Sequence, residues 1–179
     1  MNRPEDKAEQ MLRTIIKSLC KHTEEPMIRF KEATMEFIVA VDSRDQGRLV
    51  GKDGKTIWAI GTALWFAGLA CIKRPIGIQL VEPKVRAPRT PSLFKSNSQW
   101  NKTRIIELVR AILQACMGVA AKPCSILSHG DAVAVIHLDL DVYLRAACRD
   151  PSLEEAIDII IHAAGMVDGA NLKTQATWT

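Results

Sequence analysis

An internal repeat constrains the fold of this chain more than any other feature of its sequence. A shift of 97 residues aligns residues 8–68 with the second half without a gap, and the hydrophobic pattern repeats with them. Identical residues include Arg13 with Arg110, Pro26 with Pro123, Asp42 with Asp139, Asp53 with Asp150 and Gly68 with Gly165. Such a repeat indicates that one structural unit occurs twice. The alternative is two unrelated α+β pieces.

A segment rich in proline and serine separates the two copies. Residues 83–100 carry four basic side chains and no acidic one. This composition is typical of an extended linker. It predicts a first unit over residues 1–82 and a second unit over residues 101–179.

Both copies show the same order of predicted elements. Apolar residues at helical spacing predict a helix over 7–20, and alternation predicts strands over 26–30 and 37–41. A short helix (44–50), a tight turn, a long helix (55–71) and a strand (76–81) follow. The second copy repeats the helix over 104–117 and the strands near 124–128 and 132–138. We therefore expect an α+β fold of two tandem αββααβ units, each a three-stranded sheet with helices on one face.

Composition narrows the class of protein. Hydrophobic residues make up 47% and charged residues 25% of the 179 residues, which excludes disorder for most of the chain. The net charge of +4 divides into +6 for residues 1–100 and −2 for residues 101–179, which slightly favours a polyanionic partner.

The charged N-terminus does not resemble a signal peptide. The uncharged run 57–72 is short for a membrane span, so we interpret it as a buried helix. Five cysteines without a Cys-x-x-Cys pair fit a reducing, cytoplasmic compartment.

The segment around Gly51-Lys52-Asp53-Gly54 carries the most informative motif. Glycines at a turn permit backbone angles that other residues avoid, and their missing Cβ lets another backbone approach. The helix after Gly54 would present free amides, which attract anions. Lys52 and Lys55, with Arg48 one turn earlier, add positive charge. This pattern predicts a cradle for a sugar–phosphate backbone and not a catalytic site.

With its flanks the motif reads Gly-Arg-Leu-Val-Gly-Lys-Asp-Gly-Lys-Thr-Ile before an apolar helix, and it resembles a type II KH domain. The likeness covers about residues 7–82 and is greatest to small bacterial KH-domain RNA-binding proteins (KhpA-like). It implies a loop that clamps the backbone of single-stranded RNA and an apolar groove for the bases. Strand residues 38–41 would complete the groove, and Asp53 would cap the following helix. The predicted RNA-binding residues are Arg48, Leu49, Val50, Gly51, Lys52, Asp53, Gly54, Lys55 and Ile57.

The second copy departs from this motif. It has Cys148-Arg149-Asp150-Pro151 where the first has the two glycines. Asp150 and Pro151 are typical of the N-cap and first position of a helix, and acids follow in its first turn. These carboxylates would repel phosphate. We therefore expect the second unit to keep a KH-like fold without an RNA loop.

Two tryptophans on the long helix of the first copy predict an interface. Trp58, Trp65 and Leu69 share a face distinct from the stripe expected to be core. They either cover the first helix of their own unit, or pack against the second copy or another chain.

Other motifs are set aside. Ser128-His129-Gly130-Asp131 reads as a turn, the four histidines lack metal spacing, and the cysteines are expected to be inert. We predict a cytoplasmic, non-enzymatic protein that binds single-stranded RNA, as a post-transcriptional regulator or RNA chaperone. No cofactor, metal, membrane or small-molecule substrate is expected, and another KH protein or a second copy is a conceivable partner. The alternative is a protein-interaction scaffold built from KH folds with little RNA binding.

Overall fold

The computed structural model describes residues 3, 5–81, 102–117, 125–129, 133–137, 150–167 and 171–174. The predicted linker 83–100 lies outside these ranges. So do Cys148, Arg149 and the second copy's counterpart of the short helix.

The first half of the chain contains the predicted elements in the predicted order. They are α1 (Asp6–Leu19), β1 (Met27–Lys31), β2 (Glu36–Ala40), α2 (Ser43–Val50), a 3-10 turn η1 (Lys52–Gly54), α3 (Lys55–Ile72) and β3 (Gly77–Val81). In the sheet β1 pairs antiparallel with β2, and β2 pairs parallel with β3. Phe37 and Val39 of β2 are fully buried, whereas Ile38 between them is only partly buried, so one face of the sheet packs on the helices.

The second half repeats this topology within its described residues. Its elements are α4 (Lys102–Met117), β4 (Ser125–His129), β5 (Val133–His137), α6 (Pro151–Val167) and β6 (Asn171–Thr174). β4 pairs antiparallel with β5, and β5 pairs parallel with β6, as in the first sheet. The 97-residue shift carries β2 onto β5 residue for residue. The chain is therefore an α+β protein with two mixed three-stranded sheets.

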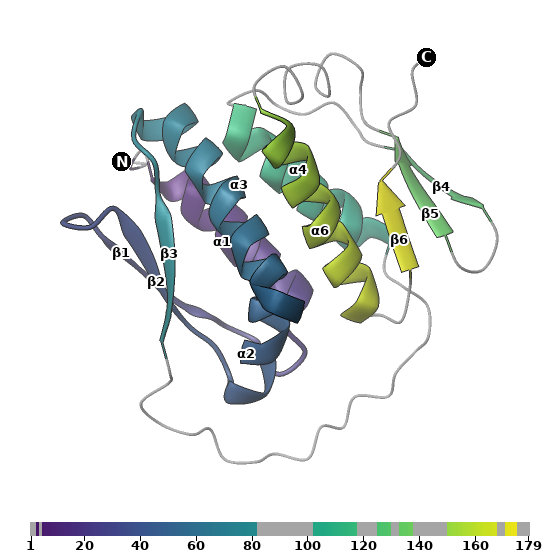
Figure 1. The fold of residues 1–179 in the computed structure, drawn as a ribbon, viewed down its shortest axis with the longest axis horizontal. Helices are drawn as coiled ribbons and strands as arrows, with labels where there is room; N and C mark the ends of the chain where they lie inside the picture. The colour runs from purple at the N-terminus through teal and green to yellow at the C-terminus, as the bar shows by residue number, and fades with distance from the viewer. Residues whose placement is uncertain are drawn as a thin grey trace.

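The helices of both halves pack together between the two sheets (Figure 1). α3 contacts both α4 and α6, and α1 contacts α4. Buried side chains of α1, α3, α4 and α6 belong to one hydrophobic cluster, which includes Ile15, Leu64, Leu108 and Ile161. The two sheets lie at opposite ends, and each leaves its outer face uncovered by these helices (Figure 1). Burial of apolar helix faces against each other is the main force that joins the halves.

Three polar contacts supplement this helix interface. The Cys116 thiol on α4 donates to the carbonyl of Ala63 on α3 at 3.3 Å, and the Cys71 thiol on α3 donates to the carbonyl of Ala115 at 3.9 Å. The Arg104 guanidinium at the start of α4 donates to the carbonyl of Ser18 in α1. These contacts require the helices of the two halves to approach closely.

α3 is the most apolar helix of the described residues. The segment Lys52–Ile72 is long and apolar enough to cross a membrane by length and composition alone. A core helix of a globular protein passes the same test, and α3 packs against α1, α4 and α6. Ala59, Ile60, Ala63, Leu64 and Ala67 are all fully buried, which confirms the expectation of a buried helix.

Candidate nucleic-acid interface

The turn between α2 and α3 adopts backbone angles that require its glycines. Gly51 has φ 73° and ψ 177°, and Gly54 has φ 75° and ψ 8°. Asp53 between them also lies in the left-handed region, with φ 55° and ψ 27°. A Cβ on Gly51 would lie 2.7 Å from the Cβ of Thr56 and 2.9 Å from its amide nitrogen, whereas a Cβ on Gly54 would meet nothing within 4 Å. Gly51 thus lets the chain pass close to α3, and Gly54 leaves open space above the turn.

α3 begins without a side-chain cap. Gly54 is its N-cap, and the first turn contains no acidic residue. The expectation that Asp53 caps this helix is therefore wrong: Asp53 lies one position too early, and its side chain is exposed. The Lys55 amide donates to the carbonyl of Lys52, and this end of α3 carries the partial positive charge of the helix dipole. Lys52 and Lys55 are exposed there, so this end of α3 can receive an anion.

The structure separates the other predicted RNA-binding residues into exposed and buried ones. Val50 is 40% exposed, Ile57 is half-buried, and Arg48 is half-buried with its Nε 3.9 Å from a carboxylate oxygen of Asp45. Leu49 is fully buried in the core, so the expectation that it lines a base groove is wrong. Leu49 lies on the buried side of α2, one turn after the buried Asp45. Of the strand residues 38–41, only Ile38 is not buried.

A buried aspartate that no sequence pattern revealed, Asp45, holds α2 in place. Asp45 is fully buried, and its carboxylate accepts hydrogen bonds from the backbone amides of Lys21 and His22 at 3.1 and 2.8 Å. It also accepts from the Thr23 hydroxyl at 2.9 Å. These bonds satisfy the buried charge and tie α2 to the segment between α1 and β1. No local signal reveals Asp45, because an aspartate on a short polar helix is normally solvated.

Asp42 fixes the start of the same helix. Its carboxylate accepts from the Arg44 amide at 2.9 Å, and both of its oxygens accept from the Arg44 guanidinium at 2.9 Å. Mainly because of the guanidinium hydrogen bonds, the pKa of Asp42 falls to about 2. Asp42 and Asp45 together set the position of α2, and hence of the turn at its end.

The start of α6 confirms the prediction that Asp150 and Pro151 begin a helix. The helix begins at Pro151, and the carboxylate of Asp150 accepts a hydrogen bond from the Ser152 amide at 2.9 Å. Glu154 adds a further acid in the first turn. The N-terminus of α6 is therefore capped by a carboxylate, whereas the equivalent end of α3 has no side-chain cap.

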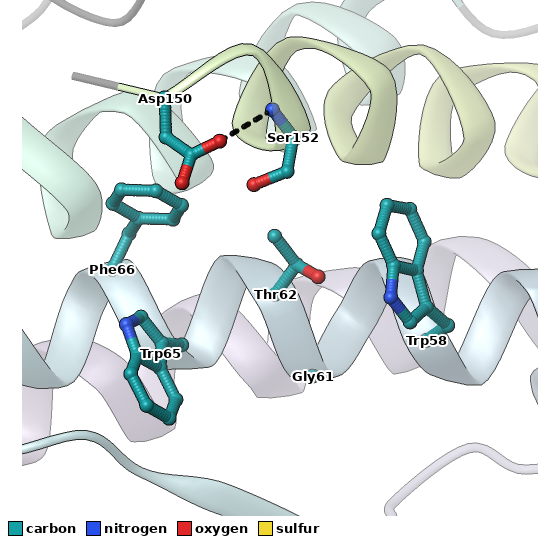
Figure 2. Close-up of a pocket in the computed structure, with 7 residues that line it drawn as sticks. All are labelled: Trp58, Gly61, Thr62, Trp65, Phe66, Asp150 and Ser152. Carbon is teal, nitrogen blue, oxygen red and sulfur yellow. Dashed lines mark hydrogen bonds between the residues drawn. The ribbon is translucent and has the colours of Figure 1, made fainter.

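A groove lies between α3 and the start of α6 (Figure 2). Its volume is about 540 Å³, and it is lined by Trp58, Gly61, Thr62, Trp65, Phe66, Asp150 and Ser152. Trp58 and Trp65 are 45% and 51% exposed, and Leu69 is 38% exposed. These three predicted interface residues are therefore buried neither under α1 nor under the second half. Thr62 and Phe66 point toward α6, whereas Trp65 turns away from it (Figure 2).

Other polar groups give no second candidate site within the described residues. Burial raises the pKa of the Cys20 and Cys116 thiols to about 12, and it also raises that of Cys71. Such thiols remain protonated and are poor nucleophiles. Residues that the structure describes form no cluster of three potential metal ligands.

Comparisons with known proteins do not assign the chain to a family. No protein-family model and no curated protein matches it. A solved structure described as "Crystal structure of APE1850" is similar over 94% of this chain and 96% of that one, with 12% sequence identity and a TM-score of 0.28. A likeness at this level carries no argument about fold or function.

Proposed function

We propose that this chain is a single-stranded RNA-binding protein of the type II KH class. Its active unit would be residues 1–82, and residues 101–179 would be a KH-like unit without an RNA loop. The observation that carries the proposal is the turn at residues 51–54. It combines two left-handed glycines, an uncapped helix N-terminus and two exposed lysines.

The proposed mechanism is clamping of the RNA backbone. The phosphate would lie at the positive end of the α3 dipole, and the open space above Gly54 would admit the ribose. Lys52 and Lys55 would each neutralise a phosphate, an attraction that salt screens. Bond-making chemistry forms no part of this proposal. The protein would act on RNA in the cytoplasm as a regulator or chaperone.

Neutralising the loop lysines tests this proposal. A Lys52→Ala/Lys55→Ala variant removes both cations at the N-terminus of α3. A matched Lys73→Asn/Arg74→Ala variant removes two cations near the other end, about 27 Å away for an 18-residue helix. Asparagine is chosen for position 73 because Lys73 has φ 60°. The readout is fluorescence anisotropy of a labelled uridine octamer, with a duplex of equal length for comparison.

The loop variant should bind the octamer about tenfold more weakly than the matched variant. Its plot of log affinity against log salt should be shallower by about 1.4, since each lost phosphate contact removes about 0.7. Equal binding by both variants, with native circular dichroism, would contradict the site. Tighter binding of the duplex than of the octamer would contradict the single-strand preference.

The exposed tryptophans favour a second candidate function. Trp58 and Trp65 lie on the surface beside a helix start that carries acids, an arrangement also suited to protein contacts. A scaffold built from these folds would bind neither octamer nor duplex at physiological salt. In that case sedimentation would show concentration-dependent self-association that Trp58→Ala weakens.

A further inference from the structure

The groove between α3 and the start of α6 runs along α3, the helix that follows the 51–54 turn. α3 begins at Lys55, and Trp58 follows within the first turn of the helix. The groove residue furthest along α3 is Phe66, about 17 Å from the helix start at 1.5 Å per residue. A strand of a few nucleotides held at the turn can therefore reach this groove.

The side of the groove formed by α3 is mainly aromatic. Trp58 and Phe66 stand on either side of Thr62 (Figure 2). The Thr62 side chain lies between the two rings, whereas Gly61 has no side chain and a Cβ there would approach only Ile78 of β3, at 3.9 Å. Flat aromatic surfaces with space beside them favour stacking of a nucleobase.

The opposite wall presents a carboxylate. One oxygen of Asp150 accepts from the Ser152 amide, and Figure 2 shows the carboxylate above the ring of Phe66. The hydrogen bond from Ser152 lowers the pKa of Asp150, so at neutral pH the group is ionised and can only accept. The remaining lone pairs of the Asp150 carboxylate favour a ligand that presents hydrogen-bond donors to them. A phosphate is disfavoured here for the same reason.

We infer that this groove binds a guanine base of the RNA strand held at the 51–54 turn. The inference rests on the proposed function and extends it to sequence preference. Guanine presents two adjacent donors, N1–H and the N2 amino group, on its Watson–Crick edge. Adenine, cytosine and uracil each place an acceptor beside their donor there, and this acceptor would face the carboxylate. The second half of the chain, although it lacks the glycine loop, thereby supplies the base-reading residue.

Four RNA octamers test this inference against the full-length protein. They are U8, UUGUUGUU, UUAUUAUU and UUCUUCUU, each labelled with fluorescein, measured by anisotropy at one salt concentration. The wild-type protein should bind the guanine octamer about tenfold more tightly than the other three.

The key variant is Asp150→Asn, because asparagine caps a helix as well as aspartate does, so α6 should remain intact. Its amide nitrogen would turn a donor toward the donors of guanine. The guanine preference should fall below about threefold, while U8 affinity stays unchanged. The matched control is Glu155→Gln, which makes the same charge change at an exposed position of α6 outside the groove lining. Trp58→Ala should weaken all four octamers about tenfold, because stacking tolerates any base.

The outcomes separate a failure of the groove assignment from a failure of the RNA-binding proposal for the 51–54 turn. Equal affinity of the wild type for all four octamers, or a guanine preference that survives Asp150→Asn, overturns the groove assignment and leaves the turn in place. Failure of the wild type to bind any octamer removes the proposed function and this inference with it. Binding of an arginine-containing peptide that Asp150→Asn and Trp58→Ala abolish, with no base preference, would assign the groove to a protein ligand instead.

Discussion

The two glycines of the 51–54 turn have different roles, although the motif presents them as equivalent. Both have positive φ, but Gly51 is pressed against Thr56 and Gly54 faces open space. Gly51 is therefore needed for the fold, because the neighbour that blocks a Cβ includes backbone of α3. Gly54 is available to a ligand. An aspartate at position 51 would therefore disturb the fold, whereas position 54 has space for its side chain.

Alanine at each glycine measures this difference. Gly51→Ala should lower the free energy of unfolding by about 3 kcal/mol, through overpacking and an unfavourable φ. Gly54→Ala introduces an unfavourable φ without overpacking, so it should lower the free energy of unfolding by only about 1 kcal/mol. Urea unfolding followed by circular dichroism gives both values. Equal losses for the two variants would show that Thr56 moves aside without cost.

At the scale of elements, α2 depends on side chains more than on its own helix propensity. It has only eight residues, and an isolated helix of that length is unstable in water. Asp42 caps its first turn and Asp45 anchors it to the loop after α1. A short helix was predicted over residues 44–50, but the anchor joins residues more than twenty positions apart. Such contacts depend on the folded arrangement and leave no periodic trace in the sequence.

The Asp42 carboxylate makes the stability that it contributes dependent on pH. Its pKa is about 2 in the folded protein against an ordinary 3.8, so its ionised form favours folding. The contribution is complete above about pH 5 and is lost as the pH falls from 4 toward 2. Asp42→Asn keeps a capping side chain but loses the charged bonds to Arg44. The variant should be about 1 kcal/mol less stable at pH 7.

Urea melts at pH 7, 4 and 2.5 measure this contribution. The stability difference between the wild type and Asp42→Asn should shrink as the pH falls. A difference that stays constant over this range would show that the carboxylate does not titrate with folding.

At the scale of the whole molecule, two sheets share one core. The buried side chains of α1 and α3 belong to the same cluster as those of α4 and α6. Separation of the halves would expose these faces to water, with a cost proportional to the apolar area. The repeat predicted two units, and the structure has two sheets. The helices of the two halves, however, form one shared core.

We therefore expect the chain to unfold in one cooperative transition. In a Trp100→Phe/Trp178→Phe background, Trp58 and Trp65 on α3 are the remaining tryptophans and report on the first half. Leu108→Ala on α4 truncates a fully buried side chain of the second half and should cost about 3 kcal/mol. Tryptophan fluorescence and circular dichroism should then shift to lower urea together. A fluorescence midpoint that does not move would show independent halves.

By itself the sequence determined the features that depend on neighbours along the chain. The apolar periods predicted the described helices and strands to within a few residues, the glycines predicted the turn, and Asp150 and Pro151 predicted the start of α6. Only the tertiary structure decided what depends on which faces meet. It buried Leu49 and Asp45, left Trp58 exposed and brought Asp150 beside α3. An apolar pattern shows that a face is buried, but the partner of that face follows from packing between residues far apart in the sequence.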